Sequence, residues 1–191
     1  MAEIRPSRHQ SKSGKTFFIR AAQGKDAKKV LACASQIIAE ERYSVTSPIE
    51  FLIGLESQIE FLESFRKEPD RIFLVAETEN REIIGTIDFT PSRLLRHRHW
   101  GEFGMGVIAS HRGQGVGQAL LESLLQWAER QGSIEKVCLS VHADNTRAIA
   151  LYKKLGFEIE GIRKRETCFG PGEYVDAVLM AKFLNDAEST G

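Results

Sequence analysis

The feature that most constrains the fold is the glycine-rich stretch Arg-Gly-Gln-Gly-Val-Gly at 112–117. An apolar run over 103–109 precedes it, and an apolar segment of helical period follows from about Gly117. The residues of that helical face are Leu120, Leu121, Leu124, Leu125 and Ala128. A strand, a glycine loop and a helix start in succession predict an anion site. Glycines let backbone N–H groups turn inward, and the helix start adds partial positive charge.

Two common phosphate-binding loops do not fit this stretch, to which Arg112 adds a full positive charge. A P-loop ends in Gly-Lys-Ser/Thr, whereas Gly117 is followed by Gln118 and Ala119. The dinucleotide-binding fingerprint needs a third glycine three residues after Gly117, and Leu120 stands there. The stretch therefore predicts either a pyrophosphate cradle of another kind or a tight strand-to-helix turn.

The chain length of 191 residues fits one domain with one core. We expect a flexible N-terminal tail over 1–15, a single domain over 16–185 and a short tail over 186–191. The 26 basic and 26 acidic residues cancel, so no broad field favours nucleic acid. The basic cluster over 93–99 is interpreted as a solvated loop, with a binding patch as the alternative.

Targeting and metal signals are absent from the sequence. No run approaches the roughly 20 apolar residues of a membrane span, and the N-terminus has no apolar segment of a secretory signal. The three cysteines, Cys33, Cys138 and Cys168, are far apart and form no Cys-x-x-Cys pair. We therefore expect a cytoplasmic protein without a membrane segment or a structural metal site.

The hydrophobic periods predict seven strands and four helices. Strands are expected over 17–20, 72–76, 83–89, 100–108, 137–141, 157–167 and 173–183. The helices are expected after an Asp26 cap, from Ser47-Pro48 to before Pro69, from Gly117, and over 145–155 with Gly156 closing it. This order predicts an α/β fold with a mixed, mostly antiparallel sheet of about seven strands, flanked by about four helices.

A second pattern lies in the last of these helices, which reads Asn-Thr-Arg-Ala-Ile-Ala-Leu-Tyr-Lys-Lys-Leu-Gly-Phe over 145–157. By themselves Asn145 is a helix cap and Tyr152 a core aromatic residue. Together with the glycine loop, however, the segment resembles the GCN5-related N-acetyltransferase (GNAT) superfamily. Its two motifs are Arg/Gln-x-x-Gly-x-Gly/Ala and Asn-x-x-Ala-x-x-Leu-Tyr-x-x-x-Gly-Phe. The C-terminal stretch around Arg163 and Tyr174 is similar to the branch that includes ribosomal-protein-alanine acetyltransferases.

The resemblance implies acetyl-CoA as co-substrate and assigns it two groups of residues. The backbone of the strand before the loop would bond the pantetheine arm of acetyl-CoA. The backbone amides of the loop would bond its pyrophosphate. Asn145 would bond the arm near the thioester. Tyr152 would protonate the leaving CoA thiolate. The cofactor-binding residues are Met105, Gly106, Val107, Arg112, Gly113, Gln114, Gly115, Val116, Gly117, Gln118, Asn145 and Tyr152.

The amine acceptor must lose a proton before it attacks, since a lysine side chain stays an ammonium ion up to about pH 10.4. Some family members carry a glutamate five positions before the motif asparagine, but Ser140 stands there in this chain. Glu102 is our candidate general base, because alternation places it on the face of Gly104 and Gly106. His142 is the alternative, and Glu102 could instead be a solvated carboxylate at the strand end.

Two classes of function follow. The first is an enzyme that moves an acetyl group to a primary amine by direct attack in a ternary complex, because neither motif holds a cysteine for a covalent intermediate. The acceptor could be a protein N-terminus, an amino acid, a polyamine or a similar amine, read by loops around 43–65, 91–99 and 168–173. The second is a non-catalytic acyl-CoA sensor. A homodimer is one option for the assembly.

Overall fold

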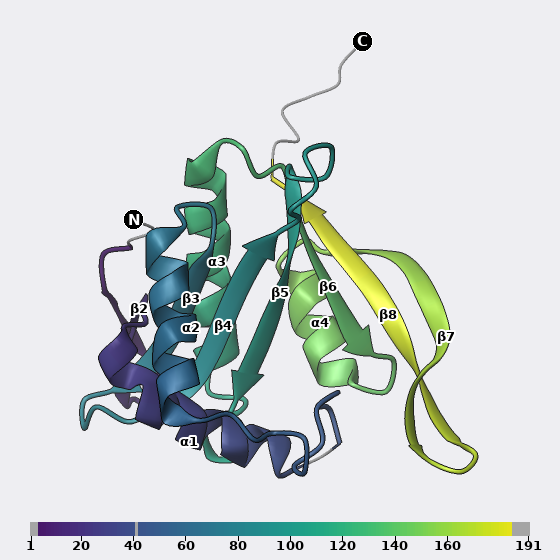
Figure 1. The fold of residues 1–191 in the computed structure, drawn as a ribbon, viewed down its shortest axis with the longest axis horizontal. Coiled ribbons are helices and arrows are strands. Elements are labelled where there is room, and N and C mark those ends of the chain that lie inside the picture. The colour runs from purple at the N-terminus through teal and green to yellow at the C-terminus, as the bar shows by residue number, and fades with distance from the viewer. Residues whose placement is uncertain (1–3, 41, 185–191) are drawn as a thin grey trace. The chain divides into compact units, whose positions relative to one another are not determined.

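The computed structural model describes residues 4–40 and 42–184. The predicted C-terminal tail, 186–191, lies outside these residues. The described residues form two compact units, the first made of 4–40, 42–90 and 104–127 and the second of 91–103 and 128–184. Figure 1 shows the elements of both.

The first unit holds most of the helices. Its strands are β1 (Ser7–Gln10), β2 (Thr16–Ala21), β3 (Ile72–Thr78), β4 (Ile83–Pro91) and the second half of β5 (Trp100–Val107). Its helices are η1 (Gly24–Asp26), α1 (Ala27–Ile38), α2 (Leu55–Lys67), η2 (Ala109–His111) and most of α3 (Val116–Gln131). The strands predicted over 72–76 and 83–89 are confirmed as β3 and β4, which pair antiparallel as a hairpin.

The core of the first unit lies on both faces of β3 and β4. Leu74, Val75 and Ala76 are all fully buried, which indicates that helices cover both faces of this hairpin. On one face, Phe89 of β4 packs edge-on against Trp127 of α3, with ring centroids 5.8 Å apart. On the other face, Phe73 contacts an aromatic pair of α2. Alternation along β4 therefore decides which residues face α2.

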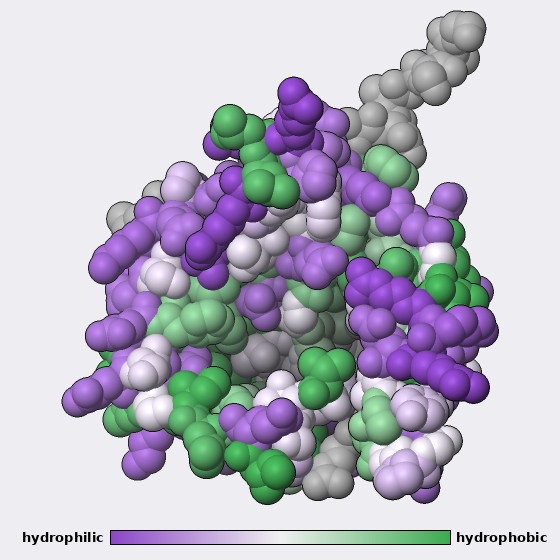
Figure 2. Space-filling model, turned by 45° about the vertical axis from the view of Figure 1, so that its right-hand side comes forward, coloured by the Kyte–Doolittle hydropathy of each residue, from purple (hydrophilic) through white to green (hydrophobic). Residues whose placement is uncertain are grey.

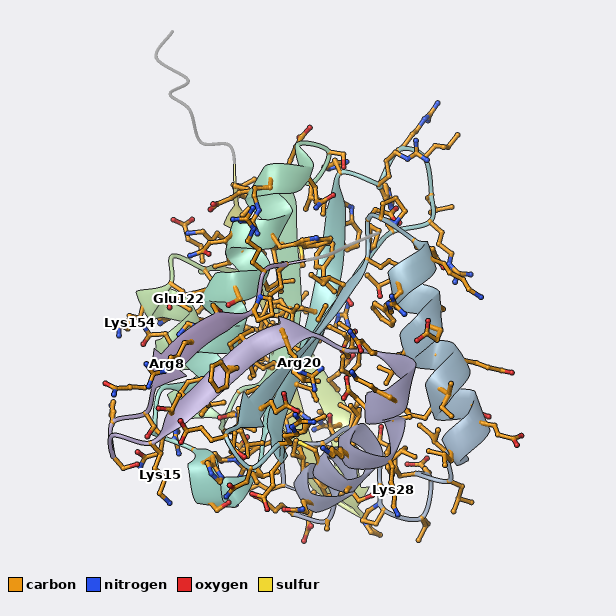
Figure 3. The ribbon with its side chains drawn as sticks, turned by 90° about the vertical axis from the view of Figure 1, so that its left-hand side faces the viewer. Arg8, Lys15, Arg20, Lys28, Glu122 and Lys154 are labelled. Carbon is orange, nitrogen blue, oxygen red and sulfur yellow. The ribbon has the colours of Figure 1, made fainter. Side chains whose placement is uncertain are left out.

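Asp26 precedes α1 as predicted, but its side chain makes no capping hydrogen bond to that helix. Its carboxylate accepts instead from the backbone N–H of Gln23 and from both terminal nitrogens of Arg20. Arg20, labelled in Figure 3, also binds Glu77 of β3. A half-buried guanidinium thus competes successfully for the carboxylate that the sequence pattern assigned to the helix end.

The second helix begins later than predicted. Ser47 and Pro48 do not start it, and α2 begins at Leu55. The backbone N–H and the hydroxyl of Ser47 both donate to the Glu50 carboxylate and close a local turn. Gly54 then adopts an extended conformation at the helix start. The helix predicted from Ser47-Pro48 was therefore wrong over its first part, which lies in an irregular segment.

The second unit begins with the first half of β5 and continues through β6 (Lys136–His142), α4 (Thr146–Lys154), β7 (Glu158–Gly170) and β8 (Glu173–Phe183). The parallel pairing of β5 with β6 joins Trp100–Glu102 to Lys136–Cys138. β8 pairs antiparallel with both β6 and β7, and β7 and β8 confirm the strands predicted over 157–167 and 173–183. Gly156, with φ of 86°, ends α4 as expected.

The strands follow the order β1-β2-β3-β4-β5-β6-β8-β7 in an eight-stranded sheet. The predicted α/β class with a mixed, mostly antiparallel sheet is confirmed. The additional strand is β1, which lies within the stretch that we expected to be a loose tail. Residues 7–10 pair antiparallel with Phe17, Phe18 and their neighbours in β2, so their polar side chains did not reveal a strand whose backbone is paired at the sheet edge.

Candidate active site

The glycine loop joins β5 to α3 as the sequence predicted. Gly113 and Gly115 have φ of 75° and 94°, in the left-handed region that favours glycine. A side chain added at Gly115 would meet no heavy atom within 4 Å, so the loop is open at that point. α3 begins at Val116, and the amides of its first turn have no acceptor within the helix. Open space, inward-turning backbone and a helix start together fit a pyrophosphate group.

Arg112 is held at the start of this loop by two partners. Its Nε donates to the backbone oxygen of Val107 at 2.8 Å, which ties the loop to the end of β5. Its guanidinium forms a two-pronged ion pair with Glu40, just beyond α1. Sequence reasoning missed Glu40, because no local pattern links two residues 72 positions apart. An anion that binds Arg112 would therefore have to compete with Glu40 for the guanidinium group.

The turn between β1 and β2 supports the loop from another side. The backbone N–H of Lys12 donates to the Gln114 carbonyl at 3.1 Å, and that of Ser13 to the Gln114 side-chain oxygen at the same distance. This turn also lines a polar cavity of about 500 Å³ that Gln114 and Val116 border. The side-chain oxygen of Gln114 therefore helps to fix the loop. The backbone N–H of Gln114 is the group that we predict to bond the pyrophosphate.

Two of the three glycines of β5, Gly104 and Gly106, share one face but have different surroundings. A Cβ at Gly106 would lie 2.7 Å from Cδ1 of Ile37, so α1 already fills the space beside this glycine. A Cβ at Gly104 would meet only one heavy atom within 4 Å, Oδ1 of Asp88 at 3.1 Å. The face is therefore open at Gly104 and closed at Gly106.

Tyr152 lies on the inner side of α4 in the second unit. Its side chain is buried between Phe103 and Phe157, with ring centroids 5.8 Å and 5.9 Å away. Burial raises the pKa of the hydroxyl to about 12. No residue in the described part of the chain forms a hydrogen bond with that hydroxyl. It therefore stays protonated at neutral pH and has a proton to donate.

Asn145 caps the same helix. Its side-chain oxygen accepts a hydrogen bond from the backbone N–H of Ala148 at 3.2 Å, which matches the capping role that its position predicts. The cap uses the amide oxygen, whereas the amide NH₂ group remains a donor for a ligand. Asn145 and Tyr152 thus lie two helical turns apart on one short helix.

The three candidates for the general base differ in exposure. Glu102 is exposed and lies at the end of the β5–β6 pairing, opposite Cys138. Ser140 is exposed on β6 and offers only a hydroxyl. His142 is buried, with Nε2 3.0 Å from the Thr167 hydroxyl and its ring against Phe169. Exposure and a free charge therefore favour Glu102 over His142.

The predicted acceptor segments carry exposed apolar side chains, and Figure 2 shows such side chains at the surface among hydrophilic ones. In the segment between α1 and α2, Val45, Ile49 and Leu52 are 80%, 83% and 85% exposed. Leu94 and Leu95 are exposed in the basic loop, as is Phe169 in the β7–β8 turn. The apolar side chains of these loops do not pack in the core, and they are therefore available for contact with another molecule.

Within residues 4–40 and 42–184, no group of three His, Cys, Asp or Glu side chains could hold a metal ion. The three cysteines are free thiols, and burial raises the pKa of Cys33 and of Cys138 to about 11. None of the described helices has the length and apolar character needed to cross a membrane.

Comparison with known proteins finds N-acetyltransferases among the relatives of this chain. An L-amino acid N-acetyltransferase of Escherichia coli is 34% identical over 101 residues, which is 53% of this chain and 62% of the relative. The chain thus spans less than two thirds of that protein's length. A ribosomal-protein-alanine N-acetyltransferase from Brucella melitensis is 28% identical, with a TM-score of 0.76 over 87% of this chain and 99% of that one.

A third similarity is one of fold. A GNAT-superfamily phosphinothricin acetyltransferase from Sinorhizobium meliloti, solved in complex with acetyl-CoA, has a TM-score of 0.77 at 19% identity, covering 100% of this chain and 93% of that one. The family model described as Acetyltransferase (GNAT) family matches residues 37–157, which include the glycine loop and the whole Asn145–Phe157 pattern. The chain belongs to the GNAT acetyltransferase family.

Proposed function

We propose that the protein is an acetyl-CoA-dependent N-acetyltransferase that acetylates a primary amine by direct attack in a ternary complex. The observation that carries the proposal is the open glycine loop at the start of α3, where Gly115 combines a φ of 94° with empty space. Such a loop offers backbone N–H groups to a pyrophosphate without a side chain in the way. Gly113 to Gln118 would hold that group, with Arg112 beside it.

The remaining residues supply positioning and proton transfer. The backbone of Met105, Gly106 and Val107 would bond the amide arm of acetyl-CoA, and the NH₂ group of Asn145 would bond the arm near its thioester. Bound acetyl-CoA supplies the activated acetyl group. Glu102 accepts a proton from the incoming amine, directly or through water, and Tyr152 donates its proton to the sulfur that leaves.

The two proton transfers that the reaction requires support the roles of Glu102 and Tyr152. An amine that arrives as an ammonium ion must lose a proton to gain a lone pair, and an exposed carboxylate such as Glu102 can receive it. Tyr152 holds its proton at neutral pH because burial raises its pKa to about 12. The presence of this donor favours an enzyme over the second candidate, a non-catalytic acyl-CoA sensor on the same fold.

The acceptor is a primary amine: an amino acid or a protein N-terminus, as the names of two of the relatives above suggest, or a polyamine. We propose to screen the L-amino acids, spermidine and a peptide that begins with alanine, with free CoA as the readout. Release of CoA with one of these amines is expected. Thermal stabilisation by acetyl-CoA without turnover on any amine would support the sensor instead. A melting temperature unmoved by millimolar acetyl-CoA would refute both functions.

A further inference from the structure

Asp88 is a charged residue in the middle of a buried strand, and sequence reasoning gave it no role. It is half-buried, whereas its neighbours Ile87 and Phe89 are fully buried. Alternation along β4 turns Asp88 to the face opposite those two side chains. It lies directly across from Phe73 of β3, and thus on the face that α2 covers.

The carboxylate of Asp88 lies close to Gly104 of β5. Its Oδ1 lies 3.1 Å from where a Cβ of Gly104 would be, and no other heavy atom comes within 4 Å of that point. Glycine at 104 therefore leaves room for the carboxylate, which a side chain at this position would approach closely. Gly104 and Glu102 are two residues apart on β5, so alternation puts both on one face of that strand.

The carboxylate has no partner that would explain its position by structure alone. Among residues 4–40 and 42–184, no other residue donates a hydrogen bond to it. Arg71, at the start of β3, is its charged neighbour, but that guanidinium stacks 4.1 Å from the Phe65 ring centroid and bonds Glu68. A carboxylate kept half-buried without a donor is unfavourable for stability and indicates a role in binding.

We propose that Asp88 binds the ammonium group of the incoming amine and so selects a cationic acceptor. This inference rests on the proposed acetyltransferase function. Asp88 attracts the ammonium form, and Glu102 then takes the proton that must leave before attack. Asp88 is a specificity-determining residue in this scheme, because it contacts the acceptor without taking part in bond making.

Charge at Asp88 depends on pH in the working range. Burial raises the pKa of its carboxyl to about 6, and the positive charge of Arg71 opposes this shift. On the same face, α2 presents the apolar Phe61 and Phe65 to Phe73, and β5 presents Gly104. The carboxylate is therefore ionised above about pH 6 and able to bind a cation, whereas below that pH it becomes neutral and loses this ability.

The test is Asp88→Asn, which keeps the shape of the side chain and removes its charge. We expect the KM for the best amine of the screen to rise about 10- to 100-fold, as for the loss of one charge-assisted hydrogen bond, with kcat at saturating amine nearly unchanged. The ratio of wild-type to variant kcat/KM should fall toward one below pH 6. Asp70→Asn, at an exposed aspartate before β3, is the control and should leave both constants unchanged.

The outcomes separate the two proposals. Wild-type protein that releases no CoA with any amine would refute the proposed function. An active wild type whose Asp88→Asn variant keeps its KM at pH 8 would refute the role of Asp88 alone. A raised KM whose ratio to wild type does not change with pH would also refute it, because a merely structural effect of the substitution would not follow the titration of the carboxyl group.

Discussion

The glycine loop and the segment between α1 and α2 differ in what they expose. The loop exposes backbone, since Gly113 and Gly115 turn it into the left-handed region and Gly115 faces empty space. The segment exposes side chains, with Ile49 and Leu52 more than four-fifths accessible. Backbone N–H groups suit a ligand part that never changes, such as a pyrophosphate, whereas side chains can be exchanged to fit a different acceptor. Substitutions in the two regions should therefore have separable effects.

The largest effect is expected for Gly115→Asp. The new carboxylate would fill the open space and repel a pyrophosphate, so acetyl-CoA should no longer stabilise the protein. At about 100 times its Kd, the ligand should add roughly 2.7 kcal/mol to the free energy of unfolding of the wild type and nothing to the variant. Thermal melting with and without acetyl-CoA measures this difference.

Gly132→Asp is the matched control, because Gly132 also has positive φ, at 67°, and open space around its Cβ position. Both variants should lose similar intrinsic stability through backbone strain. Only Gly132→Asp should keep the response to acetyl-CoA. Equal responses of the two variants would mean that the loop is a tight turn and no anion site.

Glu102→Gln tests the proposed base with the next largest effect. The amide keeps the shape and removes the charge, so kcat/KM for the amine should fall about 10²- to 10⁴-fold while binding of acetyl-CoA stays intact. The deficit should shrink as pH rises, because more amine then arrives neutral. His142→Ala is the comparison variant. A Gln variant with the wild-type rate at pH 7 would remove Glu102 from the mechanism.

Tyr152→Phe should lower kcat by about 10²-fold or more through loss of the proton donor. The ring contacts with Phe103 and Phe157 need no hydroxyl, so the stability of the fold should change little. Acetyl-CoA should still raise the melting temperature. Near-complete turnover in the variant would show that Tyr152 serves only the core.

The parts of the site that the sequence predicted are those with a local signal. The glycine spacing, the apolar face of α3 and the Asn145 cap each depend on residues within a few turns, and all three elements are found where expected. The parts that it missed depend on distant neighbours. The Glu40 partner of Arg112 and the Ile37 contact at Gly106 require the tertiary fold.

Asp88 and β1 show two further reasons why sequence patterns did not predict parts of the structure. The alternation of β4 permits a polar residue at 88, but only the placement of Gly104 shows what the carboxylate faces. β1 has no apolar alternation to detect, since its backbone pairing with β2 holds it. The late start of α2 shows the opposite case, where the periodic apolar residues Phe51 and Leu52 lie outside the helix because a local Ser47–Glu50 turn prevails.

The smallest effect, and the sharpest test of the separation between the two regions, is expected for Leu52→Ser. Leu52 is 85% exposed, so its loss should change the free energy of unfolding by no more than about 0.5 kcal/mol. The response to acetyl-CoA should equal that of the wild type, because the residue of this segment that binds Arg112 at the loop is Glu40, and the substitution leaves it in place. If the segment contacts the acceptor, the KM for the amine should rise by a few-fold, in line with the roughly 1 kcal/mol that partial burial of one leucine side chain contributes. The effect should be larger for an acceptor with an apolar side chain, such as L-phenylalanine, than for spermidine. A Leu52→Ser protein with altered acetyl-CoA binding but unchanged KM for amines would reverse the assignment of the two regions.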